Sequence, residues 1–144
     1  MNNINSCIVY SDFRSQPSVK EQGKSYTIVN TKKDKITCVK IDDCVFETEQ
    51  KKCDFLFLVE RDVPIAFFVE LKGCNVSHGI EQLHSSIKAL KNDFANHQLE
   101  ARISNIGNTI PDLKNRKTYI DLAKIVYPTT GSILVKKSPF IETI

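Results

Sequence analysis

Residues 53–72, CDFLFLVERDVPIAFFVELK, decide the fold that this sequence predicts. Two segments, residues 53–60 and 64–72, are rich in Phe, Val, Ile and Leu and are apolar on both faces. This pattern is typical of central strands that are covered on both sides of a sheet. Because residues 61–63 form only a short connection, we expect an antiparallel hairpin.

Three charged residues interrupt these apolar segments. Asp54 stands at the start of the first strand, and Glu70 and Lys72 lie two apart near the end of the second. Residues two apart on a strand share a face, so Glu70 and Lys72 point the same way. A hairpin closed about Asp62 pairs residue 54 with residue 70, which sets the two acids about 5 Å apart at Cβ. A slip of one residue would turn Asp54 to the other face.

Two facing carboxylates in a partly buried site repel each other and need a proton or a cation between them. A hard cation such as Mg²⁺ binds one or two carboxylates together with waters and phosphate oxygens. The metal would polarise a phosphate, and Lys72 would stabilise the charge that develops in the transition state. The pattern predicts a centre for phosphodiester hydrolysis. The alternative is a solvated Asp54 and an edge salt bridge between Glu70 and Lys72.

After this hairpin the apolar period changes to three and four, which predicts a helix over residues 77–97 with Ser77 as its N-cap. A strand is expected over residues 101–106, a helix over 118–127 and a last strand over 132–136. Pro128 is expected to end the second helix.

Before the hairpin, a short helix is expected over residues 15–22 and a strand over 25–30. Residues 36–41 and 44–47 are expected to form a hairpin with Asp42 and Asp43 at its tip. The order of elements predicts an α/β or α+β domain with a mixed sheet.

The 144 residues suit one domain, residues 1–144, built around one core. Hydrophobic residues make up 41% and charged residues 26%, which is usual for a soluble globular protein. The longest apolar runs, residues 55–59 and 63–69, are too short to span a membrane. The N-terminus carries no pattern of a secretory signal. We therefore expect a cytoplasmic protein with no membrane segment.

The five cysteines have no CxxC spacing, so we expect reduced thiols that behave as small apolar residues. The alternative is a zinc site formed by several of them with a histidine. The cysteines considered for that site are Cys38, Cys44, Cys53 and Cys74.

The net charge of +3 is unevenly distributed, since residues 101–144 carry +4 and residues 1–100 carry −1. A basic C-terminal third is compatible with a phosphate-rich partner. Candidate contacts to nucleic-acid phosphates are Lys114, Arg116, Lys117, Lys136 and Lys137. The alternative for each is a solvated surface cation.

The stretch CDFLFLVERDVPIAFFVELKG, followed by GIEQL, resembles the PD-(D/E)XK nuclease superfamily, which includes restriction endonucleases and archaeal-type Holliday-junction resolvases. The family signature is an acid on one core strand, Glu-x-Lys on the next and often a glutamine on the following helix. Asp54 matches the acid, Glu70-Leu71-Lys72 the Glu-x-Lys and Gln82 the glutamine. The resemblance covers residues 53–90, and Cys53 stands where the family often has proline.

The resemblance implies a restriction-endonuclease-like fold, with a mixed central β-sheet flanked by helices. It implies Mg²⁺, or Mn²⁺ in its place, held by Asp54, Glu70 and the backbone carbonyl of Leu71. Lys72 would be the catalytic lysine, and Gln82 would face the site. The family often has a further glutamate on an N-terminal helix, for which Glu21 is the nearest candidate. The alternatives are Asp42, Asp43 and Glu47.

We therefore expect a magnesium-dependent nuclease that acts on DNA in restriction, defence or repair, as a homodimer or within a larger assembly. One alternative is a nucleic-acid-binding or regulatory protein that keeps the nuclease fold without turnover. Another is an unrelated α/β interaction domain. His78 is of interest because it begins the helix after the Glu-x-Lys strand, whereas His84 and His97 are expected to be exposed.

Overall fold

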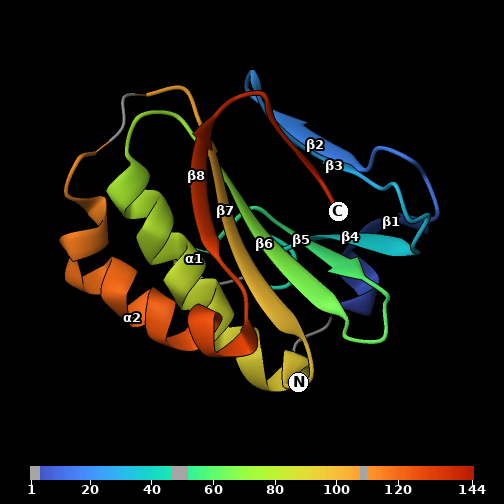
Figure 1. Cartoon of the computed structure of the whole chain (residues 1–144). Helices are drawn as coiled ribbons and strands as arrows, with labels where there is room; N and C mark the ends of the chain where they lie inside the picture. The colour runs from blue at the N-terminus through green and yellow to red at the C-terminus, as the bar shows by residue number, and fades with distance from the viewer. Residues whose placement is uncertain (1–3, 47–51, 108–109) are drawn as a thin grey trace.

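A mixed sheet of six strands forms the centre of the computed structural model, which describes residues 4–46, 52–107 and 110–144 (Figure 1). The strands lie in the order β1-β4-β5-β6-β7-β8. From β1 to β6 neighbouring strands are antiparallel, whereas β6, β7 and β8 are parallel. The bounds are β1 Ile8–Asp12, β4 Ile36–Lys40, β5 Phe55–Val59, β6 Ile65–Lys72, β7 Gln98–Asn105 and β8 Ile133–Lys137. The expected α+β class with a mixed sheet is confirmed.

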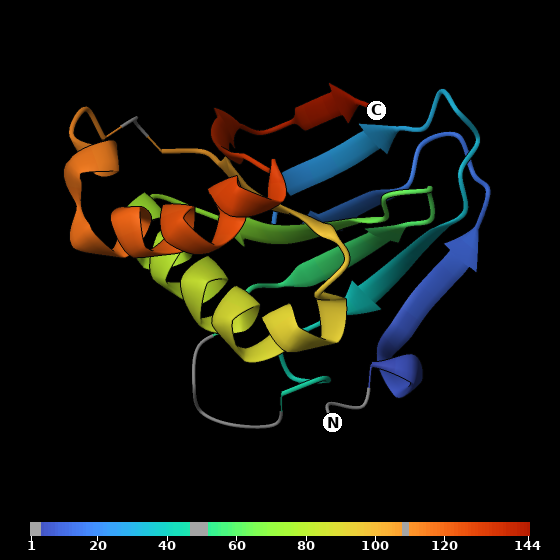
Figure 2. The same cartoon turned by 60° about the horizontal axis from the view of Figure 1, so that its bottom comes forward.

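Two different layers cover the two faces of this sheet, as Figure 2 shows. Helices α1 (Val76–Leu90) and α2 (Lys117–Val126) cover one face, and they connect the parallel strands. A second sheet covers the other face, with the strand order β2-β3-β9. Its strands are β2 Ser18–Glu21, β3 Lys24–Val29 and β9 Phe140–Thr143. The sequence did not predict this second sheet.

Strand β6 contributes to the hydrophobic cores on both faces. Ala66 and Phe68 pack against the helices, whereas Phe67, Val69 and Leu71 pack against the small sheet. Every residue of β6 is buried except Lys72, which is half-buried. The apolar runs of the sequence are therefore those of a strand covered on both faces, as expected.

The expected apolar stripe of the first helix is confirmed. Its side chains Ile80, Leu83, Ile87 and Leu90 are all buried. The N-cap is Asn75 and not Ser77, because the side chain of Asn75 accepts a hydrogen bond from the backbone N–H of His78. The helix ends at Leu90, and a short 3-10 helix, Lys91–Phe94, follows it.

The predicted helix over residues 15–22 is wrong. This segment contains β2, which pairs antiparallel with β3 and buries Val19. The turn between the two strands has positive φ angles at Gln22 and Gly23, a conformation that glycine adopts without strain. Tertiary pairing therefore determines the structure of a segment with weak local preferences.

The predicted hairpin of residues 36–41 with 44–47 is also wrong. Strand β4 pairs with β1 and β5, and the residues after it form turns with one isolated bridge, Asp42 to Phe46. Glu47 lies outside the described residues. The strands β1 and β9 were not predicted.

The expectation of five reduced thiols is wrong for Cys7 and Cys44, which form a disulfide. Cys38 and Cys53 are buried in different cores, on opposite faces of the large sheet, and Cys74 is exposed. The cysteines considered for zinc are therefore not brought together. In the described part of the chain, no helix is long and apolar enough to cross a lipid bilayer.

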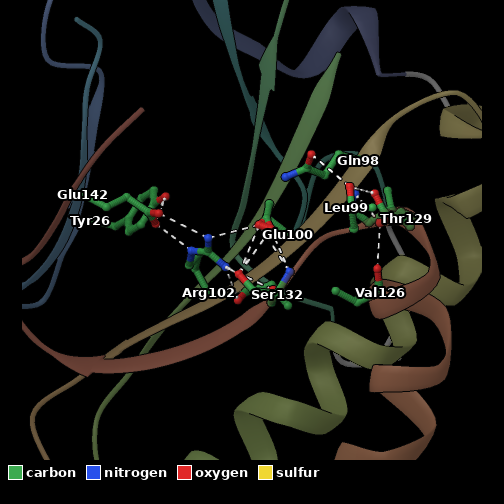
Figure 3. A network of polar contacts seen from close by, with 11 residues as sticks. Tyr26, Gln98, Leu99, Glu100, Arg102, Val126, Thr129, Ser132 and Glu142 are labelled. Atoms are coloured by element: carbon green, nitrogen blue, oxygen red, sulfur yellow. Dashed lines mark hydrogen bonds and ion pairs between the residues drawn. The ribbon is translucent and has the colours of Figure 1, made fainter. Parts of the chain in front are cut away.

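A buried ionic network joins the two sheets (Figure 3). On β7, Arg102 lies between two carboxylates, with Nε 2.6 Å from Glu142 on β9 and Nη2 3.2 Å from Glu100. The hydroxyl of Tyr26 donates a hydrogen bond to Glu142, and the backbone N–H of Ser132 donates one to Glu100. The partners come from three strands, β3, β7 and β9, and from the loop before β8, so the network fixes how β3 and β9 lie on β7.

We expect Arg102→Ala to lower the free energy of unfolding by about 3–5 kcal/mol, because it leaves the buried carboxylate of Glu100 and the half-buried carboxylate of Glu142 without their cation. Denaturant unfolding would measure the change. Arg14→Ala is the matched control, because Arg14 pairs with Asp12 at the exposed surface and exposed ion pairs contribute little. Equal losses in the two variants would contradict a structural role for the buried network.

Candidate metal centre

The pairing of β5 with β6 has the register that the sequence predicted. Phe55 pairs with Val69 and Leu58 with Ala66, and just before this ladder the backbone N–H of Asp54 donates a hydrogen bond to the carbonyl of Val69. Leu56 and Phe68 belong to the core under the helices. Because side chains alternate along β6, Glu70 and Lys72 belong to that same face. The carboxyl group of Asp54 lies within hydrogen-bonding distance of that of Glu70.

Helix α1 leaves room for the carboxylate of Glu70. A Cβ atom at Gly79 would lie 3.5 Å from Cγ of Glu70 and 3.0 Å from Cδ1 of Ile103. Since 3.0 Å is a tight contact, the absence of a side chain at Gly79 lets α1 pack closely over this end of β6.

Asp54 is held at the end of the β5–β6 ladder. Its Oδ2 accepts a hydrogen bond of 2.8 Å from the backbone N–H of Leu71. The N–H and C=O groups of one residue point to the same side of a strand. The carbonyl of Leu71, which the family resemblance implies as a ligand, therefore points toward Asp54.

The two carboxyl groups have unusual electrostatics. Glu70 is only 2% exposed, and its Oε1 has no hydrogen-bond partner among the described residues. Burial, together with the nearby charge of Asp54, raises the pKa of Glu70 to about 9. Burial also raises the pKa of Asp54. Two such groups are stable together only with a shared proton or a bound cation.

The donor atoms at this place fit a hard divalent cation. They are the carboxylates of Asp54 and Glu70, including the unpartnered Oε1, and the carbonyl of Leu71. Mg²⁺ takes one or two carboxylates and fills its remaining positions with water or phosphate oxygens. No group of three acidic, histidine or cysteine side chains suited to a metal occurs among the described residues. The site could therefore supply only part of the coordination shell.

Lys72 is positioned by residues of α1. Its Nζ donates a hydrogen bond of 2.8 Å to Oε1 of Gln82, and lies 3.9 Å from Glu70 and 3.5 Å from Nδ1 of His78. The amide of Gln82 donates in turn to the carbonyl of Lys52. The structure thus brings Gln82 and His78 to Lys72. The contact of Lys52 with Gln82 could not be predicted from the sequence, because it is made by the backbone carbonyl of Lys52 and not by its side chain.

Glu21 and Asp42 lie close enough for their charges to act on Asp54. Burial is the largest cause of the raised pKa of Asp54, and the hydrogen bond from the backbone of Leu71 opposes it. The negative charges of Glu21 and Asp42 raise this pKa further. Glu21 comes from strand β2 and not from an N-terminal helix. Asp43 is exposed. Neither Glu21 nor Asp42 completes a set of metal ligands with Asp54 and Glu70.

The predicted basic contacts do not all lie together. In the parallel ladders Lys72 pairs with Asn105, and Asn105 with Lys137, so these three residues form one row on the helix-covered face. Lys136 faces the other side, over the ring of Phe140.

The remaining basic candidates lie before or at the start of α2. Arg116 donates a hydrogen bond to the hydroxyl of Ser77 in the first turn of α1. Lys114 lines a cavity beside β8. Lys117 pairs with Asp121 along α2 and is highly exposed.

No family model matches this chain, and neither the curated proteins nor the solved structures include a protein similar to it.

In metal-free protein we expect stability to fall as the pH rises from about 5 to 9. Glu70 has its ordinary pKa near 4.5 in the unfolded chain and a pKa of about 9 in the folded one. Across this range the folded state binds one more proton, so each pH unit costs up to about 1.4 kcal/mol.

Denaturant unfolding in EDTA at several pH values would measure this decline, which Glu70→Gln should largely remove. Glu60→Gln, at an exposed position of the β5–β6 connection, is the control. If Glu70→Gln left the slope unchanged, Glu70 would not be the group that takes up the proton.

Proposed function

We propose that this protein is a Mg²⁺-dependent nuclease of the PD-(D/E)XK type that hydrolyses phosphodiester bonds, with DNA as its substrate. The observation that carries the proposal is the pair formed by the buried Glu70 and the half-buried Asp54, with an unpartnered oxygen of Glu70 and the ammonium of Lys72 beside it. Such a pair needs a proton or a cation, and a cation next to a lysine suits a phosphate.

In this proposal Asp54, Glu70 and the carbonyl of Leu71 hold the metal. Bound there, Mg²⁺ would polarise the phosphate and lower the pKa of a coordinated water; Mn²⁺ would serve in its place. Lys72 is the catalytic residue that stabilises negative charge on the phosphate oxygens. Gln82 is a positioning residue. Its side-chain oxygen accepts a hydrogen bond from the Lys72 ammonium, and its side-chain NH₂ donates one to the backbone carbonyl of Lys52, just before β5.

We propose a homodimer or a larger assembly, because one centre cuts one strand and symmetric cutting of a duplex needs two. We also propose a cytoplasmic location. The Cys7–Cys44 disulfide is an observation against that location, because disulfides persist mainly in oxidising compartments.

One observation favours a second candidate, a nucleic-acid-binding protein without turnover. Oδ2 of Asp54 already accepts the N–H of Leu71, which leaves Asp54 fewer lone pairs for a metal. Calorimetric titration with Mg²⁺ and Mn²⁺ separates the two candidates. Binding that Asp54→Asn abolishes supports the nuclease, whereas no binding supports the second candidate.

We expect Lys72→Ala to lower the cleavage rate of DNA by at least about 100-fold, because preorganised charge at the phosphate typically contributes that much. Folding and DNA binding should change little. The assay compares plasmid, single-stranded and branched DNA with Mg²⁺ present. Lys88→Ala, at an exposed position near the end of α1, is the control. Equal cutting by the wild type and Lys72→Ala would refute the proposed centre.

Lys137→Ala should weaken DNA binding more than Lys136→Ala does. The two lysines are neighbours in sequence and both are exposed, but only Lys137 lies in the row of Lys72. Loss of one phosphate contact should reduce the salt slope of binding by about one. Fluorescence anisotropy in EDTA at several salt concentrations measures both the affinity for DNA and its salt slope. A larger effect at Lys136 would place the DNA on the opposite face.

A further inference from the structure

A cavity of about 300 Å³ lies between the start of α1, the segment before α2, and strand β8. Its walls are mainly apolar, and Lys114 is the charged residue that lines it. The residues that line it include Val76, Leu113, Lys114, Tyr119, Ile133 and Val135. A cavity of this size accommodates a small planar ligand.

One wall of the cavity is the edge of the large sheet. Strand β8 is the last in the order and pairs only with β7, as its position in Figure 1 shows. The N–H and C=O groups on the outer side of an edge strand have no ladder partner. Three consecutive residues of β8, from Ile133 to Val135, line the cavity. It therefore offers apolar walls together with backbone donors and acceptors.

The cavity lies close to the candidate metal centre. Val135 pairs with Ile103, and Ile103 pairs with Glu70, so the three residues form one row across β8, β7 and β6. Two strand spacings correspond to about 10 Å. The middle residue of this row, Ile103, is fully buried beneath α1, so the row measures proximity and is not itself a path for a nucleic-acid strand. Val76, which lines the cavity, is the first residue of α1, and only a short turn separates it from Lys72 at the end of β6.

We infer that this cavity takes one unpaired base of the strand that is cut, and that the substrate therefore carries a single-stranded segment beside the cutting site. The inference rests on the proposed function. A base presents two apolar faces, which suit the side-chain walls, and a polar edge, which suits the strand edge of β8. Its phosphate lies toward the ammonium of Lys114. A base that is paired in a duplex cannot enter such a cavity without being unstacked.

The test is fluorescence anisotropy in EDTA with two labelled single strands of equal length, one intact and one with every base removed. The two strands carry the same phosphate charge, so a difference in affinity reports contacts to bases. We expect the wild type to bind the intact strand about 5- to 150-fold more tightly, as one stacked base allows. It should also bind the intact strand more tightly than a duplex of the same length.

Val135→Phe fills the cavity and should abolish the preference for the intact strand, with unchanged binding of the base-free strand. Val9→Phe is the matched control, because Val9 is exposed on β1, the other edge strand of the same sheet. Leu113→Trp fills the cavity from the loop side and replaces Val135→Phe if that variant does not fold.

Equal binding of both strands by the wild type, or a preference that survives filling of the cavity, would overturn the base-binding site alone. Binding of neither strand would overturn the proposed function and this inference with it. Loss of the preference in Val135→Phe but not in Val9→Phe supports the inference.

Discussion

The antiparallel pairing of β5 with β6 is the constraint on which the rest of this structure depends. Its register decides which side chains of both strands face the helices and which face the small sheet. With Phe57 opposite Phe67, large apolar side chains meet across the ladder, and Asp54 and Glu70 meet at its end. A shift of one residue would place the apolar side chains of one strand on the wrong faces, so burial fixes the register and the register sets the two acids against each other.

The three layers follow from the connections between the parallel strands. Because α1 and α2 make both crossovers on one face, the apolar residues of the other face need a separate cover. The small sheet provides it, with Tyr26 and Phe140 in edge-to-face contact in that core. Arg102 holds this cover in place, because its guanidinium joins a carboxylate of β9 to the central sheet. The C-terminal strand is therefore part of the framework that positions the candidate centre.

Local pattern was sufficient for the central hairpin, for the apolar stripe of α1 and for the choice of Asp54, Glu70 and Lys72 as neighbours. It was insufficient where the partner is distant in sequence. Strand β9 pairs with β3 across more than a hundred residues, and Cys7 meets Cys44 only because β1 joins the edge of β4. The short segment that contains Glu21 has no clear period, so its partner β3 decides that it is a strand. The approach of Glu21 to Asp54 is a consequence of that pairing.

Without a cation, the pair of Asp54 and Glu70 destabilises the fold. An ionised carboxylate that is buried beside a second carboxylate, with one oxygen that has no hydrogen-bond partner, is strongly destabilising, so without a cation Glu70 takes up a proton. A glutamine would fill the same space without that cost and could hydrogen-bond to Asp54. If the role of Glu70 were only structural, the acid would lower the stability of the fold without any compensating interaction. A bound divalent cation reverses the balance, because it favours the ionised forms of both acids. The same charge would draw a phosphate toward Lys72, so the feature that costs stability in the empty fold is the one that would serve the reaction.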